Sequence, residues 1–423
     1  MRLSPRSLSF TLLLGALVTF ASFATDMALP VLTQMGASLG VAPGRAALSL
    51  SVFMAGFALA PLVFGPVSDH VGRRPVLLTS CAMFALFGGL GAFSRSLGAL
   101  LLWRLLMGSG AGGCQVLVVA MVRDFFTGVE ARVKQSYVNL AAGVAPVIAP
   151  TLGVAIAALG GWRAIYGALA LGGTLLFIAA SLGLQESRQG KLEGALSARR
   201  AVAGYVRVLT HRLSVGYILL VALNFGCLFA YVSGSSLVLI NVLGVSQRVY
   251  GMLFAATSLG LMVGSLSSAR LSRRGVSHHR LITWGIWAIV GTALMLLGFT
   301  FAGIIRAVSL VPVVVIGFIG QGIVRPNAVQ GALEPVPDIA GVASAVLSAL
   351  QMLCGALASA LVAALFDGRS AIAMTSMMAI CAVTAAGVYA FVVRPAERER
   401  TAGHGVRDAG RGTRDVGRVM RGA

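Results

Sequence analysis

The stretch GPVSDHVGRRPVLL, residues 65–78, separates two long apolar runs and decides the fold of this chain. It holds two glycines that permit tight turns, Gly65 and Gly72, one carboxylate, Asp69, and the arginines Arg73 and Arg74. Such a carboxylate can face a helix N-terminus or an arginine, and the two arginines sit where the phosphates of a membrane surface lie. Taken alone, the loop is also consistent with a simple charge anchor.

The composition excludes a soluble globular protein, whose whole surface faces water. Hydrophobic residues make up 57% of the chain, charged residues only 11%, and the mean hydropathy is +0.90, whereas soluble domains carry about 25% charged residues. The net charge of +20 would suit a nucleic-acid partner only with a recognisable module on a soluble face, so we expect lipid and not nucleic acid around the chain. The five cysteines lie inside apolar runs and are interpreted as packing residues.

Twelve apolar stretches are each near the ~20 residues that a helix needs to cross a bilayer. The first one follows a basic start, MRLSPR, and contains SFA, which also fits a secretory signal peptide. The downstream runs alternate in flanking charge as one polytopic chain would, so we interpret the first as a span. The predicted spans are 8–29, 46–66, 75–94, 98–120, 134–159, 164–184, 213–239, 250–269, 281–302, 306–324, 341–365 and 370–393.

Flanking charge orients these spans. With twelve spans, 26 of the 33 Lys and Arg fall on the side of both termini, and Arg104 lies within a span. The positive-inside rule therefore predicts that both termini are cytoplasmic. The six arginines on the opposite side are Arg45, Arg95, Arg163, Arg248, Arg306 and Arg369.

The longest connection divides the chain into halves. We predict six-helix bundles over 1–184 and 213–393, a basic cytoplasmic linker over 185–212 with a short helix on the inner leaflet, and a disordered tail over 394–423. The halves echo each other, as transporter repeats do. Basic loops follow the second and the eighth span when Gly72 is aligned with Gly275, and MGSGAGG in span four matches IGFIGQG in span ten.

The full spacing GxxxDxxGRR followed by Pro75 resembles the signature loop between helices two and three of the major facilitator superfamily. Further stretches resemble its drug:proton antiporters of the bicyclomycin and chloramphenicol resistance type, the Bcr/CflA group. His70 departs from that group, which usually has arginine there. The matching stretches are TDMALP, VRDFFTG, APVIAPTLG, GWRAIY, YVSGSSLVLINVLGVSQRVYGMLFA and RPNAVQGALEPVPDIAGVASAVLSALQMLCGALAS.

The fifth span carries GVAPVIAPTLG. Pro146 and Pro150 share one helix face and bend the helix, while Gly143 and Gly153 admit a neighbouring helix. An ordinary kinked packing helix would explain this pattern. The resemblance implies instead the antiporter motif that seals the two halves on the outer side, which favours export.

The remaining polar groups in the spans suggest no enzyme. Gly108, Gly110 and Gly113 spell GxGxxG, but without a strand and a βαβ unit they indicate close helix packing. No metal, nucleotide or hydrolase motif is present, so we expect no cofactor other than protons. Neutral polar side chains in or near the spans serve either as interhelical hydrogen-bond groups or as substrate contacts, and the candidates for the substrate cavity are Gln115, Asn139, Asn224, Tyr231, Asn327 and Gln351.

Two ionisable side chains lie inside predicted spans. Arg104 aligns with the arginine of the superfamily's fourth-helix motif, here RLLMGSG, which the resemblance links to proton coupling. Asp26 is the one acid of thirteen that is embedded in a span, and all five histidines are cytoplasmic. At ~1.5 Å per residue, Asp26 lies roughly 6 Å inside Pro30 and Arg104 roughly 9 Å inside the outer end of its span. We expect the two to meet there, although Asp26 could also mark the membrane boundary or pair permanently with an arginine.

These observations predict an all-α membrane protein with twelve transmembrane helices in two six-helix bundles around a central cavity. The resemblance implies proton-coupled export of small amphipathic drugs across the bacterial cytoplasmic membrane by a monomer. A metabolite exporter or uptake symporter of the same fold is the main alternative, and a non-transporting receptor or sensor is the second.

Overall fold

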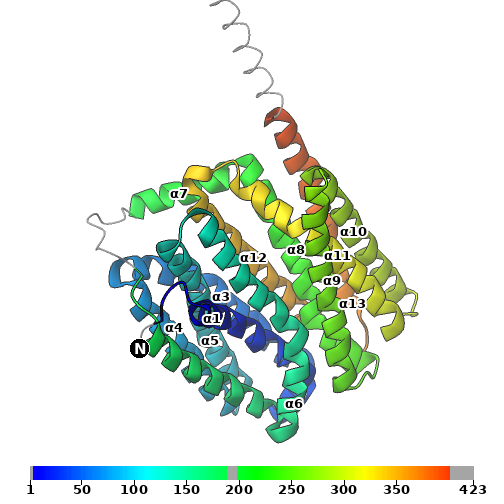
Figure 1. The fold of residues 1–423 in the computed structure, drawn as a ribbon. Helices are drawn as coiled ribbons and strands as arrows, with labels where there is room; N and C mark the ends of the chain where they lie inside the picture. Colours follow the sequence, from blue (N-terminus) through cyan, green and yellow to red (C-terminus); the bar gives the residue numbers. More distant parts are fainter. Residues whose placement is uncertain (1–2, 188–197, 401–423) are drawn as a thin grey trace, which may run out of the picture.

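The computed structural model describes residues 3–187 and 198–400, which fold into helices joined by short connections (Figure 1). The first half comprises α1 (Leu8–Asp26), η1 (Leu29–Val31), α2 (Leu32–Ser38), α3 (Pro43–Val71), α4 (Arg73–Ala92), α5 (Leu97–Phe125) and α6 (Gly128–Gly183). The rest comprises α7 (Ala198–Thr210), α8 (Arg212–Ser236), η2 (Leu237–Val242), α9 (Gln247–Arg273), α10 (His278–Phe301), α11 (Ala307–Leu333), η3 (Pro337–Ile339), α12 (Ala340–Leu365), α13 (Ile372–Val388) and η4 (Tyr389–Val393).

Among these residues eleven helices are long and apolar enough to span a membrane. One of them, α6, has 56 residues and contains a break at Gly160 and Gly161, where Gly161 has a φ of +68°. That backbone conformation favours glycine, and it reverses the chain so that α6 supplies two antiparallel spans. The twelve predicted spans are therefore confirmed.

The observed helices extend several of the predicted spans by a few residues, and two of the changed boundaries matter for the charged residues Asp26 and Arg325. The first span runs from Leu8 to Ser38, because Pro30 begins a new helical turn after a break at Asp26 and does not end the span. Asp26 is thus twelve residues from Ser38, or about 18 Å at the helical rise, and lies much deeper than expected. The tenth span extends through Pro326 to Leu333, so Arg325 belongs to the span and not to a cytoplasmic loop.

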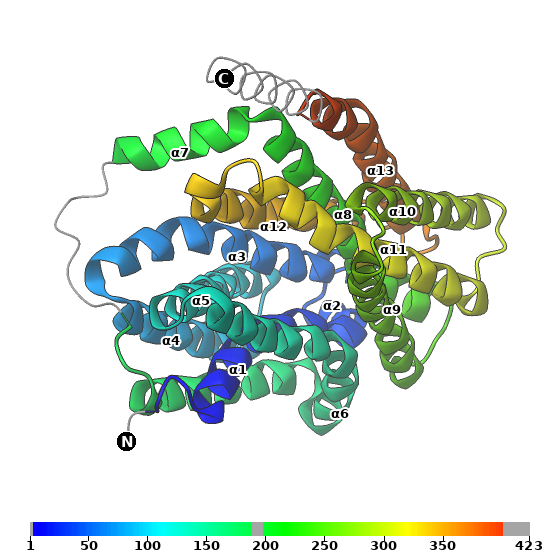
Figure 2. The same ribbon diagram turned by 45° about the horizontal axis from the view of Figure 1, so that its top comes forward.

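The helices form two groups, α1–α6 and α8–α13, as both ribbon views show (Figures 1 and 2). We call the side with Leu8, Val71 and Arg212 the terminal face, and the side with Ser38 and Val242 the far face. The two groups meet where α3 packs on α12 and α6 packs on α9. This architecture is the predicted two-bundle, all-helical membrane fold.

Glycines allow equivalent close crossings in the two halves. A Cβ on Gly112 of α5 would lie 2.5 Å from the Phe57 carbonyl oxygen of α3, and one on Gly322 of α11 would overlap the Leu261 carbonyl of α9. Gly110, in the middle of GxGxxG, likewise lies against the Ser80 carbonyl of α4. The glycine runs of spans four and ten therefore serve close helix packing, as predicted.

The beginning of the tail is helical, which corrects the prediction of disorder from residue 394 onward. Residues 394–400 continue the last helix. Ion pairs that local composition does not reveal hold this segment, since Arg400 Nη2 lies 2.6 Å from Glu334 and Glu399 lies 3.3 Å from Arg212. Residues 401–423, and residues 188–197 of the linker, lie outside the described residues. The predicted linker helix exists as α7, and its Arg207 pairs with Asp338.

Candidate functional site

The Asp26 carboxyl group lies at the end of α1, deep in the first span, with a side chain only 5% exposed. Its hydrogen-bond partner is the Thr25 hydroxyl, which donates to Oδ1 at 3.0 Å. Among the described residues no cation pairs with it, so both the expected contact with Arg104 and the permanent arginine pair are wrong. Because an isolated charge is costly at this depth, the environment accommodates this carboxyl best when it carries its proton.

Arg104 of α5 is bound by backbone groups instead. Its Nη1 donates to the Ala24 carbonyl at 2.9 Å, and its Nε donates to the Ser49 carbonyl at 3.1 Å. The guanidinium also lies over the Phe53 ring at 4.4 Å from the ring centre. Arg104 therefore joins α1, α3 and α5 directly beside the turn that holds Asp26, as a fixed positive charge.

The turn after Asp26 is enclosed by the fifth span. A Cβ on Gly153 of α6 would overlap the Met27 carbonyl, so glycine is required for this approach. Pro150 is buried on the same segment, and Pro146 is half-buried. The prediction of a close helix approach is wrong for Gly143, which is exposed and has no atom within 4 Å of its Cβ position.

The Asp26 region also borders the second bundle. The η1 turn that follows Asp26 contacts both α8 and α9, and there the fully buried Tyr250 of α9 shares a 3.0 Å hydrogen bond with Ser235 of α8. Directly after Pro150, the Thr151 hydroxyl lies 3.1 Å from the Cβ position of Gly251, also on α9. A carboxyl group at this position can therefore affect how the two bundles meet.

Further contacts join the bundles in the half of the molecule toward the far face. Thr33 donates to Asn241 Oδ1 at 2.7 Å, and Ser51 donates to Ser359 at 2.8 Å. A Cβ on Gly44 would lie 2.6 Å from the Ala363 carbonyl oxygen. Toward the terminal face, Arg123 lies 3.8 Å from the Cβ position of Gly341. The tight contacts between bundles thus lie beyond Asp26 on the far side.

The signature loop forms a network within the first bundle. Arg73 Nη1 lies 2.8 Å from Asp69 Oδ1, and Arg73 Nε lies 3.1 Å from Asp124 Oδ2 at the end of α5. Of the two partners that the sequence suggested for Asp69, a helix N-terminus or an arginine, the structure shows an arginine, Arg73. Arg74 donates to the Leu184 and Ser181 carbonyls at 3.0 Å and 2.6 Å. Both guanidinium groups therefore bind protein groups where the sequence suggested lipid phosphates.

Glu186 also binds the signature loop, and the sequence analysis did not identify it. Its two carboxylate oxygens accept hydrogen bonds from the backbone N–H groups of Arg73 and Arg74, at 2.9 Å and 3.1 Å. These N–H groups open α4, where the helix dipole favours an anion. Gly72 has a φ of +111°, and a Cβ there would lie 2.7 Å from Glu186. Gly65, by contrast, has no atom within 4 Å of its Cβ position.

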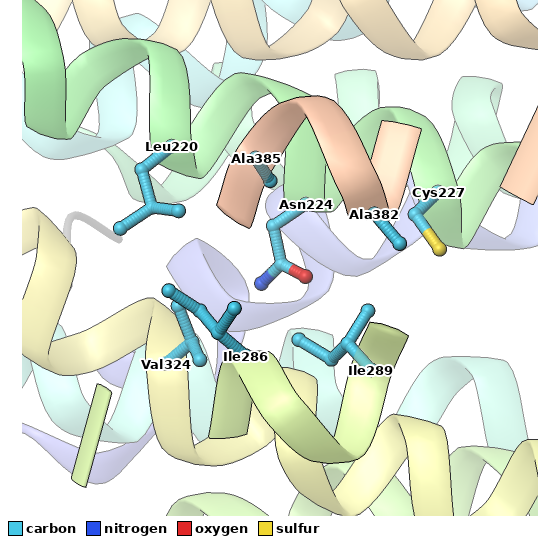
Figure 3. Close-up of a pocket in the computed structure, with 8 residues that line it drawn as sticks. All are labelled: Leu220, Asn224, Cys227, Ile286, Ile289, Val324, Ala382 and Ala385. Atoms are coloured by element: carbon cyan, nitrogen blue, oxygen red, sulfur yellow. The ribbon is translucent and has the colours of Figure 1, made fainter. Parts of the chain in front are cut away.

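The polar residues that were candidates for the substrate cavity are dispersed. Asn224 points into a small pocket within the second bundle, among Ile286 and Ile289 of α10 and Val324 of α11 (Figure 3). Its volume of about 10 Å³ is far below that of a drug molecule. Asn224 therefore lies inside a bundle and not between the two bundles.

The other candidates have mixed surroundings. Tyr231 is fully buried against the Phe318 ring, with ring centres 5.2 Å apart, and Asn327 donates to Ser268 of α9 at 2.8 Å. These two contacts support packing and interhelical hydrogen bonding. Gln351 is buried in α12, Gln115 is half-buried in α5, and Asn139 is exposed on α6 and accepts a hydrogen bond from Gln135.

Three acidic or imidazole groups at the terminal face come close enough to hold a metal ion, namely His278, His279 and Glu397. Glu397 Oε2 lies 2.8 Å from His279 Nδ1, Oε1 lies 3.3 Å from His278 Nε2, and the Tyr217 hydroxyl donates to the same carboxylate. These contacts fix the last helix to α8 and α10, far from Asp26.

One charged residue in the spans was not identified from sequence. Arg325 is exposed on α11, eight residues before the end of that helix. The dipeptide Arg325–Pro326 signals a helix end, because the residue before a proline disfavours the helical conformation. The helix continues nevertheless, and it carries the charge into the membrane region.

Comparison with known proteins agrees with this arrangement. Residues 12–359 match the model of the Major Facilitator Superfamily. The chain is 33% identical to an uncharacterized MFS-type transporter of Bacillus subtilis, YdgK, over 89% of this chain and 93% of that one. It is 27% identical to a bicyclomycin resistance protein homolog of Haemophilus influenzae, over 90% and 96%, and 26% identical to multidrug resistance protein D of Escherichia coli, over 84% and 88%.

Solved structures share the fold at low identity. A D-xylose-proton symporter superposes with a TM-score of 0.67 at 15% identity, covering 90% of this chain and 97% of that one. A bacterial homolog of the human lysosomal transporter Spinster gives 0.65 at 15% identity, covering 92% and 96%. With its signature loop, its twelve spans and these matches, the chain belongs to the major facilitator superfamily of membrane transporters.

Proposed function

We propose that this protein exports small amphipathic drug-like molecules in exchange for protons, with Asp26 as the proton carrier. The observation that carries this proposal is a buried carboxyl group at a break in the first span, which among the described residues has one hydroxyl partner and no cation beside it. Loading and releasing a proton at such a site changes its charge at the border of the two bundles. The names of the relatives, a bicyclomycin resistance protein homolog and multidrug resistance proteins, support export of antibiotics.

The transport cycle follows from the contacts between bundles. We infer that the terminal face is cytoplasmic in the bacterial inner membrane, because 26 of the 33 Lys and Arg were counted on that side and moving Arg325 into the span removes only one. The hydrogen bonds Thr33–Asn241 and Ser51–Ser359 then close the outer side. Rocking of the bundles would break these contacts and open the outer side. This cycle needs only one copy of the protein. It requires no cofactor and no chemical change of the substrate.

The proposal is tested by loading cells that express the protein with ethidium and measuring fluorescence over time. Export predicts lower accumulation than in vector controls, and a protonophore should abolish the difference. An uptake symporter would raise accumulation, and a receptor or sensor would leave it unchanged. A broad antibiotic-susceptibility panel with and without the gene then identifies the substrates.

A further inference from the structure

Arg325 is a permanently charged group inside a membrane span that the proton-coupling site does not use. It lies eight residues, or about 12 Å along the helix, from the terminal end of α11 at Leu333. Within the described parts of the chain it forms neither a hydrogen bond nor an ion pair with protein, and its side chain is exposed. Ionisable side chains in spans are rare and costly, so an unpaired one indicates a functional partner.

The packing of α11 determines where Arg325 points. Gly317, Gly320 and Val324 lie on the face that contacts α10, where Gly317 meets Thr292 and both Gly320 and Val324 meet Gly285. Arg325 is about 100° from Val324 around the helix and directs its side chain elsewhere.

Phe318 gives the direction of Arg325, because residues seven apart lie on nearly the same face of a helix. The Phe318 ring packs on Tyr231 of α8 at 5.2 Å, and its Cβ lies 3.4 Å from the Cβ position of Gly260 on α9. Arg325 therefore points between α8 and α9. Both of these helices contact the first bundle, α8 at η1 and α9 at α6. The guanidinium thus faces the space between the bundles and not the outer surface of the second bundle.

We propose that Arg325 binds an anionic group of the exported molecule, a carboxylate, sulfonate or phosphate, so that the substrates include acidic or zwitterionic amphipathic compounds. This inference rests on the proposed export function. A guanidinium offers five donors in a planar fork that matches such oxyanions, and charge-assisted hydrogen bonds are strong where water is scarce. Arg104 does not compete for this anion, because backbone carbonyls bind its guanidinium, and Arg325 is not engaged by Asp26, which pairs with no cation among the residues that the structure describes.

A pair of dyes with one xanthene core tests the anion preference. Fluorescein is anionic and rhodamine 123 is cationic, and fluorescence anisotropy measures the binding of each to the purified full-length protein in neutral detergent. We expect Arg325→Gln to weaken fluorescein binding about tenfold or more, and Arg325→Lys to weaken it less. Rhodamine 123 binding should not weaken. Arg280→Gln removes an equal charge from an exposed position near the start of α10 and should change neither affinity.

Two further arms separate the possible outcomes. Added phosphatidylglycerol should not displace fluorescein if a soluble anion is the ligand, whereas displacement that depends on Arg325 would assign the site to a lipid headgroup and overturn the substrate assignment. Equal fluorescein affinity in wild type and Arg325→Gln, or no fluorescein binding at all, would also overturn it. The binding assay needs no proton gradient. If cells export neither ethidium nor fluorescein while fluorescein binding still depends on Arg325, the export function alone is rejected.

Discussion

Arg104 donates a 2.9 Å hydrogen bond to the Ala24 carbonyl, two residues before Asp26, and neither it nor any other cation in the described part of the chain pairs with the Asp26 carboxyl group. The arginine holds the helix that bears the acid without neutralising the acid itself. Such an arrangement suits a carboxyl group that must gain and lose a proton, because a permanent ion pair would fix its charge. Under our proposal the two residues have different roles, because Arg104 positions the backbone and Asp26 carries the proton.

Replacing Arg104 tests this positioning role. Arg104→Leu removes both hydrogen bonds to the Ala24 and Ser49 carbonyls and the contact with Phe53. We expect a loss of about 1 kcal/mol of stability per hydrogen bond and strongly reduced export. Arg104→Lys keeps a charge and one donor group, so it should lose less of both. Thermal unfolding in detergent measures the effect, and an unfolding midpoint of Arg104→Leu equal to wild type would argue against this role.

Two glycines of the fifth span form a matched pair. Gly153→Ala places a methyl group against the Met27 carbonyl and should push α6 away from the turn after Asp26. We expect a clear loss of export with normal amounts of protein in the membrane. Gly143→Ala, at a position with no atom within 4 Å, should export as wild type does. Equal ethidium export by the two variants would show that the close approach at Gly153 is not required.

The signature loop offers a second matched pair. Gly72→Ala combines a φ of +111° with a methyl group 2.7 Å from Glu186, so we expect a loss of about 1–2 kcal/mol and slower export. Gly65→Ala adds a good helix former at an open position inside α3 and should be neutral or slightly stabilising. Thermal unfolding and initial export rates of both variants measure these two effects. A Gly72→Ala protein as stable and as fast as Gly65→Ala would contradict the structural reading of this loop.

Orientation is tested with reporter fusions at defined positions. A reporter that is active only in the cytoplasm should work after Gln189 and in the tail, because the basic flanks lie there. A reporter that is active only outside should work near Arg95 and Arg369. The reverse pattern would place the signature loop outside and refute the charge argument.

The sequence was sufficient for the spans and the family, because apolar length, flanking charge and the GxxxDxxGRR spacing are local properties. It misjudged the relation of Asp26 to Arg104. Helical rise gives depth along each span but not the direction of a side chain, and the partners of Arg104 turned out to be backbone carbonyls. Glu186 was missed because its hydrogen-bond donors are distant in sequence. They are the backbone N–H groups of Arg73 and Arg74, more than one hundred residues away.

Two kinds of prediction were wrong because they rested on local sequence, namely the ends of two spans near prolines and the disorder expected from the composition of the tail. The predicted spans ended at residues 29 and 324, next to Pro30 and Pro326, yet the structure continues both spans through these prolines. Asp26 therefore lies deeper than predicted, and Arg325 lies inside the membrane region. Residues 394–400 have the composition of a disordered segment, but ion pairs with Arg212 and Glu334 order them. Asn224 was a candidate for the substrate cavity as well as for interhelical hydrogen bonding, because polarity alone does not tell which side of a helix faces a neighbour. The structure places it inside the second bundle.

The most direct test of proton coupling compares Asp26→Asn with wild type in everted membrane vesicles under an imposed pH gradient. Asp26→Asn keeps the size and the hydrogen bond to Thr25 but cannot carry a proton. Asp367→Asn is the control, because Asp367 lies in a far-face loop where the N–H groups of Arg369 and Ser370 hold its carboxyl pKa below the usual range. We predict that wild type and Asp367→Asn accumulate ethidium when the gradient is applied, and that Asp26→Asn, present in equal amount, does not. Gradient-driven accumulation by Asp26→Asn would contradict its role as the proton carrier.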